Sequence, residues 1–392
     1  MLALWNPTGV RELWDEFLPQ LIEDHLRSIT EQGVINLMLR ELSSNLGPDL
    51  MKKVVNSVSQ RESSIFFIDG PGGSGKTFLY RAILAYLRTE GHIAIATATS
   101  GIAATMIPGG RTAHYRFKIP VPADSTSTCN IPVDTDLADL IRKASLIIWD
   151  EATMDNRYTF EALDQTLRDV TKVELPFGGK ILVLGGDFRQ VLPVIERGTR
   201  AQAVSACLTN EKFWKHVKVI HLKENIRSRL DPGSSEFLLR IGDGVEPYVM
   251  VEMVKLADDT VLEWDGEKDV RRLIDEAFPR LEENEFDKVY MSRRALITLK
   301  NDVVEKLNQK VVEIFPGAEV VYHSFDTITD DPKNLWTKYF LNTIVPGGLP
   351  PHKLILKIGS PIILSRNLDP KCGLCNGTRL LCRRLFTNFI DA

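Results

Sequence analysis

A segment of eight residues, 70–77, has the residue types and the spacing of a phosphate-binding loop. It follows the apolar run 65–68 and reads Gly70, Pro71, Gly72, Gly73, Ser74, Gly75, Lys76 and Thr77. Backbone N–H groups of a glycine-rich turn converge on phosphate oxygens only where no side chain intervenes, and the following helix adds its positive dipole end. In this pattern the lysine reaches the β- and γ-phosphates, and the threonine hydroxyl binds Mg²⁺. The segment therefore predicts a site for ATP with Mg²⁺ as the cofactor.

Two adjacent carboxylates follow the third apolar run, residues 146–149. At a strand end, Asp150 would hold Mg²⁺ through water, while Glu151 would orient and deprotonate the attacking water. Acidic residues often end strands, so the pair alone is a weak indication of a nucleotide site. The phosphate-binding loop in the same sheet makes the indication strong. We predict Thr77 and Asp150 as metal-binding residues and Lys76, Asp150 and Glu151 as catalytic residues.

Later strand ends offer further candidates for contact with the nucleotide. Gln190 follows the apolar run 181–184, and its amide can both donate to a phosphate oxygen and accept from the attacking water. Arg189 is the alternative for this role, unless it only braces the loop. Arg227 follows the run 217–222 and is either a cation for the transition state or half of a surface ion pair. We predict Gln190 and Arg227 as catalytic residues.

Apolar runs alternate with helical patterns between residues 63 and 222, which indicates a parallel sheet covered by helices. The predicted strands are 65–68, 93–97, 146–149, 181–184 and 217–222. Each run ends where a polar or glycine-rich segment begins. Ligands of open α/β sheets bind outside the carboxyl ends of the strands, so we expect these segments to line one crevice. Residues 111–135 interrupt the alternation and predict an extended loop or a small insertion.

The rest of the chain carries weaker signals. Residues 13–42 have helical spacing and charged faces, which suit either a helical arm or a partly ordered linker. A strand at 295–298 and a helix over 301–314 suggest a second α/β lobe that begins near residue 287. Residues 346–351 predict a loop. Short strands are predicted at 354–358, 362–364 and 379–383, with turns at 359–360 and 376–377.

Charge is unevenly distributed along the chain, whose formal net charge is −4. Residues 243–287 hold 15 acidic and 5 basic residues, most simply a solvated face. Residues 333–386 hold 9 basic residues and 1 acidic residue. This second stretch is either a surface that follows phosphates or a basic face without a ligand. Its basic residues include Lys353, Lys357, Arg366, Lys371, Arg379, Arg383 and Arg384.

Length and composition indicate a soluble enzyme of two or three domains, since the chain has 392 residues of which 44% are hydrophobic. No apolar stretch approaches the roughly 18 residues that span a bilayer, and the N-terminus lacks a secretory pattern, so no membrane partner is expected. Five cysteines, an odd number, fit a reducing compartment. Cys372 and Cys375 form a C-x-x-C pair without the second pair of ligands that structural zinc needs.

Taken together, these motifs resemble the PIF-one-like DNA helicases of superfamily 1B, in particular their helitron-type relatives. The similar segments are the phosphate-binding loop, 98–104, 108–114, the Asp150–Glu151 pair, 185–193, positions 298 and 301, and 341–384. They cover about three quarters of the chain. The resemblance implies an α/β fold of the P-loop NTPase (RecA-like) class, a parallel sheet with helices on both faces, plus a partial second RecA-like lobe that carries a small β-rich accessory domain.

The resemblance also implies domain limits. They are a helical N-terminal arm (1–50), a RecA-like ATPase lobe (51–240), an acidic linker or helical segment (241–286), a partial second RecA-like lobe (287–340) and an accessory domain of the 2B type (341–387). The implied function is an ATP-dependent DNA helicase that couples ATP hydrolysis to 5′ to 3′ translocation on single-stranded DNA and to duplex unwinding. Its implied settings are DNA repair, recombination or telomere maintenance.

By the same resemblance, hydroxyls and aromatic rings at the strand ends grip the DNA, with hydroxyls for phosphates and rings for bases. The implied DNA-binding residues are Thr99, Ser100, Thr112, His114 and Phe117. Taken alone, His114 reads equally as an ordinary structural histidine. The implied partners are ATP, single-stranded DNA and duplex junctions, and the chain is expected to be monomeric. A nuclear location follows from the family only, because no targeting signal is visible.

The sequence departs from the family in two places. Residues 46–50 contain no glutamine where the family has its adenine-contacting residue. The family's last two motifs, one that touches DNA and one that provides an arginine across the nucleotide cleft, have no counterpart before Ala392, so a C-terminally truncated chain is expected. One alternative function is therefore a nucleotide-gated, non-motor protein that binds single-stranded DNA. A second alternative is a P-loop ATPase that acts on protein or RNA.

Overall fold

The computed structural model describes residues 48–392 apart from 196, 229–230, 251–252, 299, 325–336, 338–339, 341, 343–350, 367, 370–373 and 375. The chain divides into two compact units, whose described parts are residues 48–254 and residues 255–392. Each unit has its own description below. Most of the predicted helical arm, the predicted loop at 346–350, and Cys372 and Cys375 lie outside the described residues.

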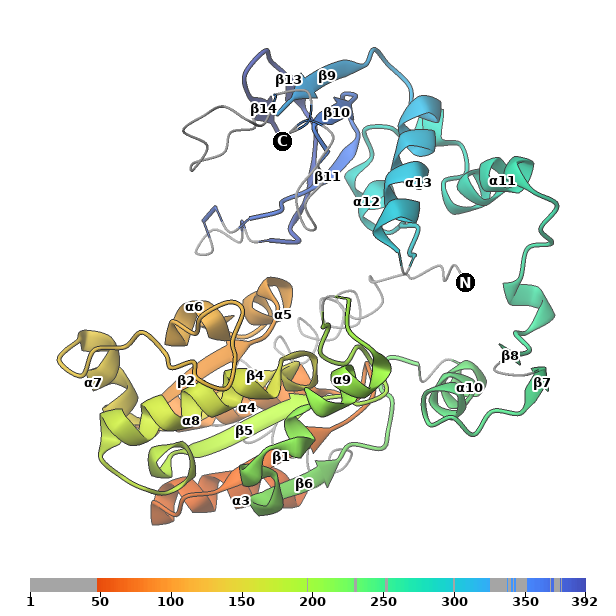
Figure 1. The fold of residues 1–392 in the computed structure, drawn as a ribbon. Helices are drawn as coiled ribbons and strands as arrows, with labels where there is room; N and C mark the ends of the chain where they lie inside the picture. Colours follow the sequence, from red (N-terminus) through yellow and green to blue (C-terminus); the bar gives the residue numbers. More distant parts are fainter. Residues whose placement is uncertain are drawn as a thin grey trace, which may run out of the picture. The chain divides into compact units, whose positions relative to one another are not determined.

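The first unit is built on a sheet of six parallel strands in the order β3, β2, β4, β5, β1, β6 (Figure 1). The strands are β1 (Ile65–Asp69), β2 (Ile93–Ala98), β3 (Arg111–Thr112), β4 (Ala144–Asp150), β5 (Ile181–Gly186) and β6 (Val217–His221). The central strands are apolar along nearly their whole length because helices cover both of their faces. All five predicted strands are confirmed. Strand β3 and the helix after it lie within residues 111–135, where the sequence predicts only a loop or an insertion.

Helices and one short hairpin complete this unit. The helices are α3 (Pro48–Gln60), α4 (Lys76–Thr89), α5 (Gly101–Thr105), α6 (Ala113–Phe117), α7 (Asp136–Lys143), α8 (Arg157–Thr171), α9 (Arg200–Ser205) and α10 (Pro232–Gly242). The hairpin consists of β7 (Tyr248–Met250) and β8 (Met253–Val254), which pair in antiparallel fashion.

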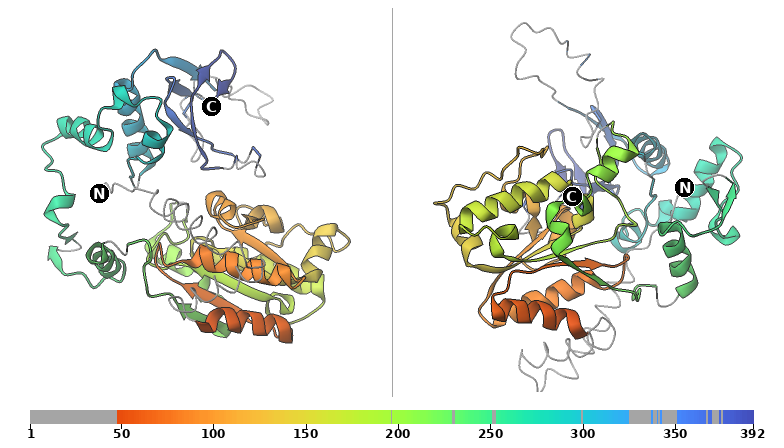
Figure 2. Two further views of the ribbon diagram at one scale, coloured as in Figure 1. Left: turned by 180° about the vertical axis from the view of Figure 1, so that it is seen from behind. Right: turned by 60° about the horizontal axis from the view of Figure 1, so that its bottom comes forward.

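Successive strand residues point to opposite faces of the sheet, so each face has its own apolar core. Phe67, Ile147 and Leu182 lie in a core with residues of α6, α7 and α8. The alternate residues Phe66 and Ile148 lie in a second core with residues of α3 and α4. Figures 1 and 2 show these helices on the two sides of the sheet. The predicted fold class, a P-loop type parallel sheet between two helical layers, is confirmed for this unit.

Gly185 in β5 is a position where a larger residue cannot fit. A Cβ added there would lie 1.6 Å from the hydroxyl of Tyr80 in α4, and the Tyr80 side chain is fully buried. We expect Gly185→Ala to lower the free energy of unfolding by about 1–3 kcal/mol, because overpacking forces neighbouring groups to shift. Urea unfolding measures this loss.

The matched control is Gly233→Ala in α10, where the nearest atom to an added Cβ is 3.8 Å away. Alanine is the better helix former, so this change is expected to leave stability unchanged or raise it by up to about 1 kcal/mol. Equal stability of Gly185→Ala and the unmodified protein would contradict the close contact with Tyr80.

The second unit combines helices with short antiparallel strand pairs. Its helices are α11 (Glu267–Ala277), α12 (Lys288–Ser292) and α13 (Asn301–Ile314). Its strands are β9 (Val320–His323), β10 (Lys353–Leu356), β11 (Pro361–Ile363), β12 (Arg379–Leu381), β13 (Arg384–Leu385) and β14 (Ile390–Asp391), paired as β9–β10, β11–β12 and β13–β14. A small core includes Ile274, Phe278, Tyr290 and Phe315.

Most of the elements predicted in the second unit form. The helix over 301–314 is confirmed as α13, and the three short strands are confirmed as β10, β11 and β12. The predicted strand at 295–298 is wrong, because this segment has no regular structure. The assignment of residues 287–340 to a partial second lobe, like the other domain limits, stays a prediction.

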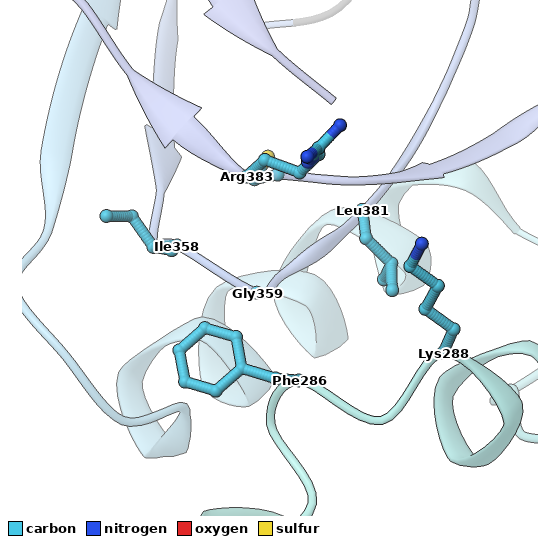
Figure 3. Close-up of a pocket in the computed structure, with 7 residues that line it drawn as sticks. Phe286, Lys288, Ile358, Gly359, Leu381 and Arg383 are labelled. Carbon is cyan, nitrogen blue, oxygen red and sulfur yellow. The ribbon is translucent and has the colours of Figure 1, made fainter.

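A pocket opens in the second unit between the segment before α12 and the β-strands (Figure 3). Phe286 and Lys288 line it from one side, and Leu381 of β12 lines it together with Ile358 and Arg383, which lie in segments that connect strands. It shares no residue with the phosphate-binding loop. As for membranes, none of the helices within the described residues has both the length and the apolar character that a bilayer crossing requires.

Candidate functional site

The phosphate-binding loop connects the end of β1 to the start of α4, at the carboxyl edge of the sheet. Gly70 donates its N–H to the carbonyl of Gly186 in the adjacent β5 (3.3 Å), and the Ser74 hydroxyl donates to the Pro71 carbonyl across the loop (2.8 Å). Gly75 has a φ of 89° and caps α4, whose first turn carries no acidic residue. The positive end of this helix is therefore free of a negative side chain and favours an anion.

The Lys76 side chain lies over the loop. Its Nζ donates to the carbonyls of Gly70 (2.5 Å) and Pro71 (3.4 Å), and the residue is 8% exposed. Its charge is close enough to Asp150 to oppose the rise in the pKa of that carboxyl. The ammonium group thus lies between the loop and the acidic pair, where it can meet the phosphates of a bound nucleotide.

Strand β4 brings Asp150 and Glu151 to the same edge of the sheet. Asp150 is 3% exposed, and burial together with the charge of Glu151 raises its pKa from 3.8 to about 6. Glu151 has a φ of 54°, and its Oε2 is buried without a hydrogen-bond partner among the described residues. Two adjacent carboxylates, one with an unsatisfied oxygen, fit a site for a divalent cation. Thr77, the second residue of α4, and Asp150 are the residues that would hold Mg²⁺.

The raised pKa of Asp150 predicts a stability cost of its charge. The folded-state pKa of about 6 lies above the ordinary value of 3.8, so ionisation destabilises the fold. This cost is fully present above about pH 6 and disappears as the pH falls towards 3.8. We expect Asp150→Asn to raise the free energy of unfolding at pH 7.5 by up to about 3 kcal/mol, and by less at pH 5.

Urea unfolding at these two pH values, in the absence of nucleotide and Mg²⁺, measures this gain. The matched control is Asp169→Asn on α8, because Asp169 is exposed and its substitution removes one carboxylate from the surface. It is expected to change stability by less than about 0.5 kcal/mol. A loss of stability in Asp150→Asn, or an equal gain at both pH values, would contradict the burial of a charged carboxylate at this strand end.

Arg189 and Gln190 follow β5, and their side chains make different contacts. The Gln190 Nε2 donates to Asp187 Oδ2 (3.0 Å), and it is the nearest group, at 3.7 Å, to a Cβ added at Gly72 of the loop. Gln190 therefore lies where it can contact a γ-phosphate. Arg189 instead braces the loop among three carboxylates, those of Asp243 (2.6 Å), Asp187 (3.3 Å) and Asp69 (3.8 Å). Asp187, the polar residue directly after β5, is not among the residues predicted from the sequence.

Arg227 packs directly against the phosphate-binding loop. The Gly73 carbonyl accepts hydrogen bonds from the N–H groups of Ile226 (3.0 Å) and Arg227 (3.3 Å). A Cβ added at Gly73, whose φ is 89°, would lie 2.6 Å from the Cβ of Arg227 and 2.5 Å from Asn225 Oδ1, so only glycine fits here. Burial lowers the pKa of Arg227 from its ordinary value. The residue as a whole is exposed, and its cation beside the loop is better placed for a nucleotide than for a surface ion pair.

Four of the five predicted DNA-binding residues come together at the ends of β2 and β3. These strands pair Ala98 with Thr112, so Thr112 lies next to the segment that holds Thr99 and Ser100. The Ser100 hydroxyl accepts a hydrogen bond from the Ala103 N–H and caps α5 (3.2 Å). In the adjacent α6, His114 is half-buried with its Nε2 3.8 Å from Asp155 Oδ1.

Thr99 connects this group to the acidic pair. Its hydroxyl donates to the backbone carbonyl of Glu151 (2.8 Å) and accepts a hydrogen bond from the indole N–H of Trp149 (3.0 Å). The backbone N–H of Thr99 also donates to the Asp150 carbonyl (3.0 Å). A shift of Thr99 would therefore act directly on the backbone that positions both carboxylates.

The structure contradicts the prediction that the Phe117 ring stacks against DNA bases. Phe117 is 0% exposed, belongs to the core under α6 and stacks on Trp149 with ring centroids 6.3 Å apart. Its role is to pack α6 onto the sheet. The predicted basic surface of the second unit also needs a correction at Lys357, which is buried and donates to the Phe315 carbonyl (2.7 Å).

Comparison with known proteins identifies the family. The model of the PIF1-like helicase family matches residues 46–245, which contain every site residue described above for the first unit. The chain belongs to the PIF1-like helicase family. A model of the 2B domain of the DNA helicase Pif1 matches residues 339–385, the segment that the sequence analysis assigns to the accessory domain.

Individual relatives agree with the family. The ATP-dependent DNA helicase PIF1 of Danio rerio is 26% identical over 356 residues, covering 87% of this chain and 49% of that protein. The protein of the same name from Rattus norvegicus is 29% identical over 324 residues, covering 81% and 43%. This chain thus spans less than half the length of these relatives. A crystal structure of Pif1 helicase from Bacteroides with ADP-AlF3 and single-stranded DNA has a TM-score of 0.58 at 21% identity, covers 87% of this chain and 71% of that chain, and shows the shared fold.

Proposed function

We propose that this chain is an ATP-dependent DNA helicase, which couples ATP hydrolysis to 5′ to 3′ translocation on single-stranded DNA and to duplex unwinding. The observation that carries the proposal is the meeting of the phosphate-binding loop, Asp150, Glu151 and Gln190 at one edge of the sheet, with Thr99 hydrogen-bonded to the Glu151 backbone. The relatives named ATP-dependent DNA helicases support the same function.

In this proposal each residue has a defined task. The loop amides and Lys76 hold the phosphates, and Thr77 and Asp150 would hold a Mg²⁺ ion, whose charge would offset that of the phosphate oxygens. The Glu151 carboxylate takes a proton from the attacking water. Gln190 orients that water beside the γ-phosphate, while Arg227 stabilises negative charge in the transition state.

The hydrogen bond from Thr99 to the Glu151 carbonyl suggests how DNA stimulates hydrolysis. Thr99 belongs to the group of strand-end residues proposed to grip the DNA, so a bound strand shifts the backbone of the catalytic pair by direct contact. The DNA-binding residues and the catalytic pair are therefore linked directly, without intermediate residues between them. A monomer, a nuclear location and a role in repair, recombination or telomere maintenance belong to the same proposal and rest on the resemblance stated in the sequence analysis.

Measurement of phosphate release with and without oligonucleotide tests the function. We expect hydrolysis to depend on Mg²⁺ and to rise several-fold when single-stranded DNA is added. Partial duplexes with a single 5′ tail or a single 3′ tail then test unwinding. We expect faster strand separation with the 5′-tailed duplex. DNA binding without hydrolysis would instead support the non-motor protein that binds single-stranded DNA. Hydrolysis that is stimulated only by RNA or by protein would support a P-loop ATPase that acts on those ligands.

A further inference from the structure

Five basic residues of the first unit lie at the turn 106–111 or in and beside α6, and none of them has a carboxylate partner within the described residues. We call this group the α6 basic surface, and its members are Arg81, Arg88, Arg111, Arg116 and Lys118. Arg81 donates to the carbonyl of Met106 (2.7 Å), Arg88 to that of Pro108 (3.0 Å) and Arg116 to that of Gly109 (3.2 Å). These contacts gather three of the five side chains on one turn.

The α6 basic surface is a cluster of cations that has no acidic partners among the residues that the structure describes. Several other arginines of the described chain do form ion pairs to Asp or Glu, namely Arg142, Arg157, Arg168, Arg189, Arg240, Arg271, Arg280 and Arg384. Within the described residues, no carboxylate lies within ion-pair distance of any member of the α6 basic surface. Its positive charge is therefore left for an external anion.

An exposed tyrosine lies beside two of these cations. Tyr115 in α6 is 55% exposed, with the Lys118 Nζ 4.4 Å and the Arg111 Cζ 5.4 Å from its ring centroid. Tyr115 is also three residues after Thr112, the N-cap residue of α6, and so lies about one turn along from it. An aromatic ring with cations beside it is the arrangement that binds single-stranded nucleic acid, because the base stacks on the ring and the cations take the flanking phosphates.

We propose that Tyr115 is a stacking platform for one base of single-stranded DNA, with the flanking phosphates bound by Arg111 and Lys118. This inference rests on the proposed function and names the aromatic contact that Phe117 cannot make. Stacking of a base on an aromatic ring is stronger than an exposed cation–π contact, so a base displaces the cations from the ring and frees them for phosphates. Bases inside a duplex are already stacked, so the platform selects unpaired strands.

Fluorescence anisotropy of a labelled oligothymidine with the full chain tests the platform. We expect Tyr115→Ala to weaken binding by roughly 5- to 100-fold, the effect of losing one stacked base, while Tyr115→Phe binds within about twofold of the unmodified protein. Tyr248→Ala is the matched control, because Tyr248 is an equally exposed tyrosine of the same unit, on β7. It is expected to bind normally. Thermal unfolding confirms that each variant is folded.

The dependence of binding on salt tests the phosphate contacts separately. Arg111→Gln and Lys118→Gln are each expected to reduce the slope of log K against log salt by about 0.7, whereas Tyr115→Ala changes the affinity with little change in slope. If the unmodified protein binds the oligonucleotide and Tyr115→Ala binds equally well, this proposal is overturned and the proposed function stands. If the unmodified protein binds no single-stranded DNA, both are overturned.

Discussion

Replacing Lys76 with alanine is expected to lower the rate of ATP hydrolysis by about 10²–10³, the effect of removing one charged donor from a site that stabilises developing negative charge. The Lys76 ammonium is nearly buried and lies against the carbonyls of Gly70 and Pro71. No other lysine of the described chain makes a hydrogen bond to the loop. Phosphate release under saturating Mg²⁺ and ATP measures the loss.

Lys52→Ala on α3 is the control for Lys76→Ala, since it removes an exposed lysine from a helix of the same unit. This control is expected to hydrolyse ATP at the normal rate. The binding of a fluorescent ATP analogue separates two effects in Lys76→Ala, weaker nucleotide affinity and slower chemistry. Normal hydrolysis in Lys76→Ala would show that hydrolysis does not need the phosphate-binding lysine, and it would contradict the proposed mechanism.

The sheet and its loop could be predicted because their signals are local in sequence. Apolar runs mark the buried strands, and the run that forms β1 leads directly into Gly70. The carboxyl ends of parallel strands meet at one edge, so residues after separate runs could be placed together before any contact was known. This reasoning correctly brings Gln190 and Arg227 to the loop.

Other features depend on contacts that sequence spacing does not reveal. Arg189 is fixed by carboxylates from residues 69, 187 and 243, and only the folded chain brings these together. In α6 the two aromatic residues lie two positions apart, and the helix turns Phe117 into the core and leaves Tyr115 in solvent. A helix of five residues is too short for its hydrophobic pattern to show which ring is buried.

Strand β3 was missed for a similar reason. It has two residues, Arg111 and Thr112, which pair with Thr97 and Ala98 of β2. A run this short has no alternation that could predict a strand. Lys357 was expected on the surface, because it belongs to a basic stretch of the sequence. In the structure it is buried, and its ammonium group donates a hydrogen bond to the Phe315 carbonyl inside the second unit.

Replacing Glu151 with glutamine is expected to slow ATP hydrolysis by about 10²–10⁴ while ATP binding is retained, because the amide cannot accept the proton that the carboxylate takes from water. Glutamine has nearly the same shape, and the backbone contacts to Thr99 and Asp150 do not involve the side chain of residue 151. The fold and the metal-binding carboxylate should therefore be preserved. Single-turnover phosphate release and analogue binding measure the two steps.

Glu174→Gln is the matched control, because Glu174 is an exposed glutamate of the same unit, beyond the end of α8. It should hydrolyse ATP normally and respond normally to single-stranded DNA. Glu151→Gln should bind single-stranded DNA as the unmodified protein does, since the strand-end residues are untouched, but added DNA should no longer stimulate hydrolysis. Retained stimulation in Glu151→Gln would show that another group accepts the proton, and the buried, unpaired Oε2 would then need a different role.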